Sequence, residues 1–147
     1  GGIAQASGYG GWVLFRFMDR GKKQPVMDTV TLYHYHGSGG GGPVTRGTIQ
    51  TNRLGIFSPD AQIVLTGHTH DEWAVTIPRQ RITKCGSIYH DEQLHIRAPG
   101  YKDAWGKGEG GWEVEKMQGP KAIGSQWLKF YWDWRAGCVR YDSTRAK

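Results

Sequence analysis

The chain of 147 residues is expected to form an α/β fold in a single domain, residues 1–147, that is rich in strands after residue 71. Two patterns predict this fold. Up to residue 70 a strand, a helix and another strand follow one another, and after residue 71 short apolar or alternating runs recur between turn signals. A hydrophobic content of 37%, with 12% aromatic residues, is sufficient for a packed core.

The first half of the chain predicts a strand–helix–strand unit after a loop at residues 1–11 and an apolar strand from Trp12 to Met18. Residues 27–36 alternate with period two, which is typical of a strand, and a turn is expected between these two strands. A glycine loop at residues 37–42 follows, and then helical spacing over about residues 45–56. The compact apolar run from Ala61 to Leu65 predicts a buried strand that leads directly into Gly67.

The second half of the chain predicts shorter strands separated by turns and one long loop. Residues 99–111 contain five glycines and are expected to form that loop. In residues 125–134 the aromatic side chains alternate, and we interpret their common face as core rather than as a base-stacking platform. The expected strands are Trp73 to Pro78, Gln80 to Cys85, Gln93 to Ala98, Ser125 to Trp134 and Val139 to Tyr141.

The charge of the chain favours an anionic partner. The formal net charge is +6 and the pI is about 9.4, which suits a phosphorylated substrate or nucleic acid. The two cysteines, Cys85 and Cys138, are far apart and predict neither a disulfide framework nor a cysteine zinc site. No apolar run approaches the roughly 18 residues that cross a bilayer, and we expect a cytoplasmic protein without a membrane partner.

Two His-X-His pairs follow predicted strands and are candidate metal ligands. His68 and His70 come after Gly67, and His34 and His36 precede Gly37. Neutral imidazole suits zinc, manganese, iron or nickel. Strands joined by one helical crossover are neighbours in a parallel sheet, so we expect His36 to approach His68 and His70. His34 either faces the same site or packs against it.

The sequence resembles calcineurin-like metallophosphoesterases, and phage and prophage members in particular. The run from Tyr35 to Gly41 and the run from Asp60 to Asp71, which contains Gly-His-Thr-His, look like the last two metal motifs of that family. Residues 98–103 and 119–127 also resemble its C-terminal strands. The similarity covers the chain from about residue 27 onward.

The resemblance implies a metal-dependent hydrolase of phosphomonoesters or phosphodiesters, with nucleic acid as a possible substrate. It implies the C-terminal portion of a sandwich of mixed β-sheets flanked by helices. His36 and His68 would bind one divalent ion and His70 the other, and these three residues would form the catalytic centre. The two ions, typically about 3.5–4 Å apart, would be manganese, iron, zinc or nickel and would polarise the phosphoryl group. A phage-encoded protein would act in the host cell cytoplasm.

The family's earlier motifs, Asp-X-His, Gly-Asp-X-X-Asp and Gly-Asn-His-Asp/Glu, do not occur in these residues. The chain begins with Gly1 rather than Met, so we expect a missing N-terminal segment of the same protein to carry them, unless the motifs are truly lost. Residues 1–147 alone are then expected to bind metal weakly and to turn over little substrate.

Other residues have weaker predicted roles. The glycine loop would let a phosphate approach closely, or else is a flexible linker. Arg46 and Arg53 would clamp the phosphate, or else are solvated surface charges. Asp71 would orient a metal-binding histidine, or else cap a turn. We interpret His90 and His95 as structural or exposed. The predicted substrate-binding residues are Gly39, Gly40, Arg46 and Arg53, and the predicted supporting residues are His34 and Asp71.

Two other functions compete with the enzyme. The first is a non-catalytic, β-rich binding or structural module with a vestigial metal site. The second is a single-ion site made by His36, His68 and His70 with an unrelated role.

Overall fold

The computed structural model of the protein describes residues 8–19, 21, 26–39, 42, 44–103, 105 and 119–146. Within these residues the chain forms seven strands and one helix, so the predicted mixed, strand-rich organisation is confirmed. The elements are β1 (Gly10–Met18), β2 (Val26–Tyr35), α1 (Thr48–Phe57), β3 (Ile63–Thr66), β4 (Trp73–Ile82), β5 (Ile88–Arg97), β6 (Ser125–Asp133) and β7 (Cys138–Ala146).

Five of these strands form one mixed sheet in the order β1-β2-β3-β5-β4. β2, β3 and β5 run parallel to one another, while β1 and β4 pair antiparallel at the two edges. The crossover from β2 through α1 to β3 makes these two strands neighbours, as the sequence predicted. β6 and β7 form a separate antiparallel hairpin.

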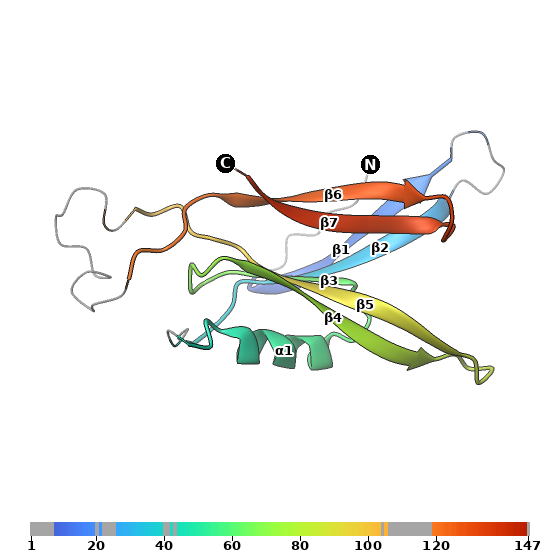
Figure 1. Ribbon diagram of the computed structural model, residues 1–147, viewed down its shortest axis with the longest axis horizontal. Helices are drawn as coiled ribbons and strands as arrows, with labels where there is room; N and C mark the ends of the chain where they lie inside the picture. The colour runs from blue at the N-terminus through green and yellow to red at the C-terminus, as the bar shows by residue number, and fades with distance from the viewer. Residues whose placement is uncertain are drawn as a thin grey trace.

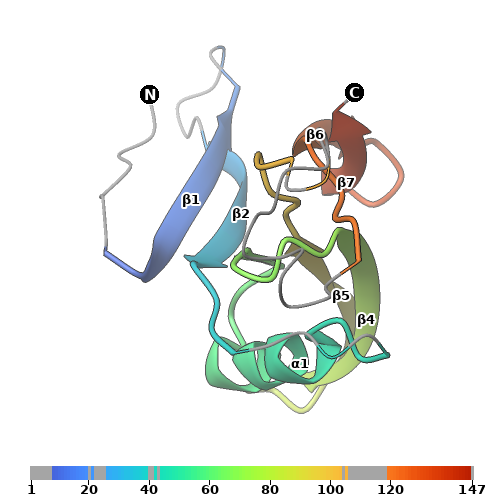
Figure 2. The same cartoon turned by 90° about the vertical axis from the view of Figure 1, so that its left-hand side faces the viewer.

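The helix and the hairpin lie on opposite faces of the five-stranded sheet (Figures 1 and 2). The hydrophobic core lies between the sheet and the hairpin, where Val30, Ile63 and Ile96 are fully buried. Phe15 and Phe130 meet across this layer with ring centroids 4.8 Å apart. Leu128, Phe130 and Trp132 therefore pack against the core, as predicted for segment 125–134, whereas Trp134 lies beyond the end of β6 and is 84% exposed.

The layer beneath α1 is polar instead. Gln93, His95 and Arg97 alternate along β5 toward the helix, and all three are buried. Helix α1 approaches them closely because Gly55 has no side chain. A Cβ at Gly55 would lie 2.7 Å from Gln93 Oε1 and 3.0 Å from His95 Cε1. Thr51 is the buried residue one turn earlier in the helix.

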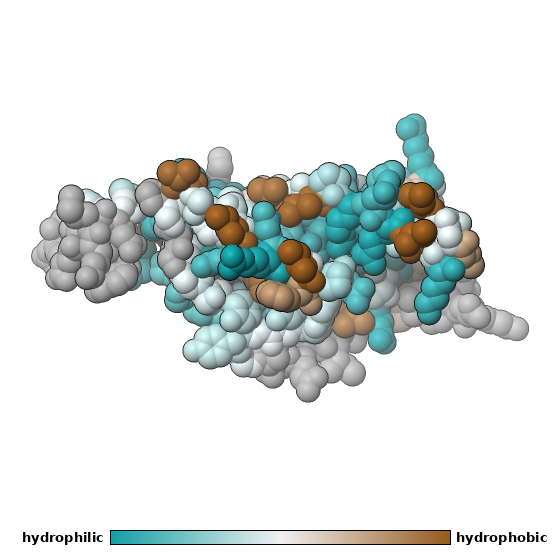
Figure 3. All heavy atoms as spheres, turned by 90° about the horizontal axis from the view of Figure 1, so that it is seen from below, coloured by the Kyte–Doolittle hydropathy of each residue, from teal (hydrophilic) through white to brown (hydrophobic). Residues whose placement is uncertain are grey.

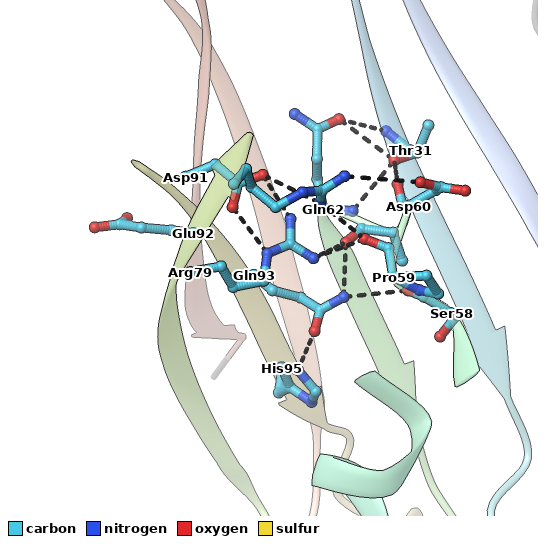
Figure 4. A network of polar contacts seen from close by, with 12 residues as sticks. Thr31, Ser58, Pro59, Asp60, Gln62, Arg79, Asp91, Glu92, Gln93 and His95 are labelled. Atoms are coloured by element: carbon cyan, nitrogen blue, oxygen red, sulfur yellow. Dashed lines mark hydrogen bonds and ion pairs between the residues drawn. The ribbon is translucent and has the colours of Figure 1, made fainter. Parts of the chain in front are cut away.

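A network of polar contacts fixes the connection between α1 and β3 (Figure 4). Arg79 of β4 donates two hydrogen bonds to Asp91, at 2.8 and 2.9 Å, and a third to the Pro59 carbonyl at 2.8 Å. The Gln93 amide donates to the Ala61 carbonyl at 2.7 Å. Bidentate arginine–carboxylate contacts hold a defined geometry, so this network sets where β3 enters the sheet.

Two expectations about the strands after residue 71 were wrong. Residues 73–82 form one strand, β4, rather than two strands broken after Pro78, and residues 83–87 form the turn. Proline is tolerated there because β4 is an edge strand, where a missing N–H leaves no ladder partner unsatisfied. The strand expected from Gln93 to Ala98 begins earlier, at Ile88, so His90 lies within β5.

Other boundaries differ by a few residues. β1 begins at Gly10 instead of Trp12, and β7 continues to Ala146 because it pairs with the whole length of β6. The helix spans 48–57 rather than 45–56. Flanking helical layers were expected for the complete protein, and among the described residues α1 supplies the layer on one face (Figure 1). Most of the predicted turn 19–25, part of the glycine loop and most of loop 99–111 lie outside the described residues.

No helix among the described residues has the length and apolar character needed to cross a membrane.

Candidate functional site

The two histidine motifs meet at the carboxyl edge of the sheet, immediately after neighbouring parallel strands. His36 follows β2 and His68 follows β3. The main chains are joined here by a hydrogen bond from Gly67 N to the His36 carbonyl at 3.1 Å. This edge is where open α/β sheets usually place their functional groups.

The imidazoles of His36 and His68 contact each other directly. His36 Nε2 lies 3.1 Å from His68 Nδ1, and the ring centroids are 5.1 Å apart at 72°. Both side chains are exposed, so the pair is open to solvent. Tyr9 packs edge-on against the His36 ring, and the Tyr9 carbonyl accepts a hydrogen bond from His36 N at 2.7 Å.

Gly37 is what allows the two loops to approach so closely. Its φ is +99°, and a Cβ placed there would lie 2.8 Å from the Gly67 carbonyl oxygen and 3.0 Å from His68 Cβ. His68 itself has a positive φ of 75°. Glycine at position 37 therefore serves both the backbone conformation and the contact between the motifs.

We expect Gly37→Ala to lower the free energy of unfolding by about 2–4 kcal/mol, because it adds a clash with backbone to the cost of a positive φ. Gly86→Ala is the matched control, since Gly86 also has a positive φ, of 85°, but has no atom within 4 Å of its Cβ position. Urea unfolding of both variants measures the difference. Equal losses in the two variants would contradict the close packing of Gly37.

Arg97 holds the Gly-His-Thr-His turn from beneath. It is 1% exposed, and its guanidinium donates to the Gly67 carbonyl at 2.8 Å and to Thr69 Oγ1 at 2.9 Å. It also donates to the Gly47 carbonyl at 3.2 Å and to Thr51 Oγ1 at 3.1 Å. Burial lowers the pKa of Arg97 from its ordinary value, and the Asp71 charge partly offsets this shift. Arg97 thereby couples the turn to the start of α1.

His70 lies apart from the pair, with a positive φ of 57° and its ring against Gly100. A Cβ at Gly100 would come within 2.8 Å of His70 Cγ. His70 lines a small cavity together with Lys102, Asp103, Trp105 and Lys121. Charges of both signs therefore surround His70, since Lys121 is also paired with Asp71.

Asp71 is paired with a lysine. Its Oδ1 accepts a hydrogen bond from Lys121 Nζ at 2.6 Å. Its Oδ2 is buried and, within the described part of the chain, has no hydrogen-bond partner. Asp71 was predicted to orient a histidine, but among the described residues it forms no hydrogen bond with a histidine.

The remaining predicted residues lie around the loop and the helix. Gly39, with φ +76°, packs against the Gln50 amide, and Arg53 is exposed on α1. The Arg46 carbonyl accepts a hydrogen bond from Trp73 Nε1 at 3.1 Å. His34 stands opposite Leu65 in the β2–β3 register, and Gly40 is outside the described residues.

The histidine pair fits one metal ion on distance. With metal–nitrogen bonds of about 2.0–2.1 Å, two imidazole ligands on one ion have nitrogens about 2.9–3.4 Å apart at angles of 90–109°. The observed separation of 3.1 Å falls in that interval. Two histidines are half of a four-coordinate shell. Across the described residues, no group of three or more histidine, cysteine, aspartate or glutamate side chains is arranged to hold an ion.

Comparisons with protein-family models, with curated proteins and with solved structures found no match to this chain.

The role of Arg97 was not predicted from the sequence, because its partners Gly47 and Thr51 are far away in the chain. One signal was present, because Arg97 is a charged residue at the end of a strand and directly precedes Ala98-Pro99-Gly100.

Proposed function

We propose that this chain is the histidine half of a metal-dependent phosphoesterase that belongs to a longer protein and hydrolyses a phosphomonoester or phosphodiester. The contact of 3.1 Å between His36 Nε2 and His68 Nδ1 carries the proposal. A pair of exposed imidazoles at ligand spacing is supported on a backbone that a glycine and a buried arginine hold in place. Such support is typical of sites that need fixed ligand geometry.

In this proposal His36 and His68 hold one divalent ion through Nε2 and Nδ1, and His70 is available for a second ion. The finer fold assignment, the C-terminal portion of a calcineurin-like sandwich, is part of the same proposal. When bound, the ions would stabilise negative charge on the transferring phosphoryl group and supply a nucleophile from water at neutral pH. The residues of this chain orient the ligands and keep them accessible to the substrate.

The overall charge of the chain suits a phosphorylated substrate. The formal net charge is +6, whereas the cavity beside His70 combines Lys102 and Lys121 with Asp103. A net positive charge raises the local concentration of an anionic substrate. Nucleic acid and smaller phosphate esters both meet this requirement.

The metal content of the protein tests the proposal. In equilibrium dialysis against zinc or manganese at a range of ion concentrations, we expect metal binding by the unchanged chain and at least a ten-fold lower affinity in His68→Ala, because one of two shared ligands is lost. His90→Ala is the control, since His90 is exposed and lies on β5 away from the pair. Equal metal content in all three proteins would contradict the proposed site.

A non-catalytic module with a vestigial site is the second candidate. Its support is that no cluster of three or more ligand side chains forms among the described residues. Metal that binds as tightly to His68→Ala as to the unchanged chain would favour this alternative.

A further inference from the structure

A groove of about 460 Å³ lies between α1 and β2 and ends beside the histidine pair. Tyr33 and Tyr35 line it from β2, and Gln50, Arg53 and Phe57 line it from α1. The size is within the range of small-molecule sites, which is about 300–1,000 Å³.

The groove has aromatic walls that are accessible. Tyr33 and Tyr35 share the face of β2 that turns toward the helix, because alternate residues of a strand point the same way. Phe57, the last residue of α1, is 80% exposed. Figure 3, which views the molecule from the α1 side, shows separate hydrophobic patches between hydrophilic side chains on this face. Flat, exposed rings are suited to stacking against another planar group.

Polar groups on the same helix supply hydrogen bonds. Gln50 Oε1 is buried and accepts no hydrogen bond from the described residues, while the Gln50 amide nitrogen packs against Gly39. Arg53 lies three residues further along the helix, and therefore on the same side, and it is exposed. A glutamine amide that turns its unpartnered oxygen toward the groove, beside a guanidinium donor, gives a pattern that reads the edge of a nucleobase.

One end of the groove, which is the candidate nucleobase site, lies toward the candidate metal centre. Gly37 and Ser38 line that end and directly follow His36 in the chain. Thr66, two residues before His68, lines the same groove, so the phosphate of a ligand with its base in the groove would lie at the sheet edge where the segments carrying His36 and His68 leave their strands. Arg53 lines the groove and is exposed, which favours an anionic ligand over a neutral aromatic one.

We propose that the groove between α1 and β2 binds the base of a nucleotide unit whose phosphate lies at the His36–His68 edge. This inference rests on the proposed phosphoesterase function, because it assigns the substrate class of that site. It commits to a nucleotide as the ligand, either free or at the end of a nucleic-acid strand.

The test compares adenosine 5′-monophosphate with ribose 5-phosphate, which lacks the base, by NMR titration of the 147-residue chain. We expect the mononucleotide to bind on the order of ten-fold more tightly and to shift the Gln50 side-chain amide resonances. Phe57→Ala should remove most of this advantage and leave ribose 5-phosphate binding unchanged. Ile56→Ala is the matched control, since Ile56 is 75% exposed on the same helix end but does not line the groove.

Equal binding of the two ligands, or equal effects of Phe57→Ala and Ile56→Ala, would overturn the proposal. Adenosine, which has no phosphate, tests the groove independently of the proposed phosphoesterase function. If adenosine still binds the groove in His68→Ala, and if the metal content of the protein does not depend on His68, only the phosphoesterase proposal is contradicted. A 5′-phosphorylated dinucleotide that binds more tightly than the mononucleotide would support the groove and identify a strand end as the source of the base.

Discussion

Replacing Arg97 by alanine is expected to lower the free energy of unfolding by about 3 kcal/mol and the Tm by about 10 °C. The Arg97 side chain is 1% exposed and donates to two carbonyls and two hydroxyls, on Gly67, Gly47, Thr69 and Thr51. The substitution leaves these acceptors buried without donors and opens a cavity. Thermal unfolding followed by circular dichroism measures the loss.

The same change should also weaken metal binding, since the turn that carries His68 loses its support. Arg145→Ala is the control for loss of an arginine, because its side chain is 53% exposed and its ion pair with Glu72 lies near the surface. We expect this control to cost less than about 1 kcal/mol. A smaller effect of Arg97→Ala than of Arg145→Ala would show that the buried guanidinium does not organise the site.

Acid should destabilise the protein through His95, by on the order of 3 kcal/mol between pH 6.5 and pH 4. Burial, helped by the nearby Arg79 charge, lowers the pKa of His95 to about 4. The unfolded chain binds a proton near pH 6.5 and the folded chain does not, so stability falls as the pH drops through this window. It levels off below pH 4, where both states are protonated.

The hydrogen bonds of His95 show which ring nitrogen would take up the additional proton. Gln93 uses its amide nitrogen to donate to the Ala61 carbonyl, so its Oε1 accepts from His95 Nε2 at 2.8 Å. Nδ1 then carries the lone pair, and it is buried with no partner among the described residues. A proton on Nδ1 would introduce a charge directly beneath α1, where Gly55 makes close contact.

Urea unfolding at pH 7, 6, 5 and 4 measures this dependence, and we expect His95→Gln to flatten it. His90→Gln is the matched control, because His90 is on the same strand but exposed. If the stability of His95→Gln falls with pH as steeply as that of the unchanged chain, another group is responsible for the acid sensitivity.

The sequence was sufficient for the part of the fold that local patterns control. Period-two alternation identified β2, and a strand–helix–strand order predicted that β2 and β3 would be parallel neighbours. The parallel pairing of β2 and β3 places His36 beside His68, although the two residues are 32 positions apart and no local sequence pattern connects them. The pairing of the two motifs was therefore predictable from topology.

Features that depend on contacts between distant segments were not predictable. Gln93, His95 and Arg97 alternate with apolar residues, a pattern that suggests a solvent-facing side of a strand. The structure buries them because α1 packs over that face. Likewise the break expected at Pro78 disappeared because β4 lies at the sheet edge, which only the full strand order reveals.

Titration of the chain with paramagnetic Mn²⁺, followed by NMR of the imidazole resonances, shows whether His36 and His68 share one metal ion. We predict that the His36 and His68 rings broaden together at the lowest ion concentrations, while the exposed His90 ring, away on β5, stays sharp. In His68→Ala the broadening of His36 should require at least ten-fold more ion. If His36 and His68 broaden no more than His90, the pair does not bind metal and the account is contradicted.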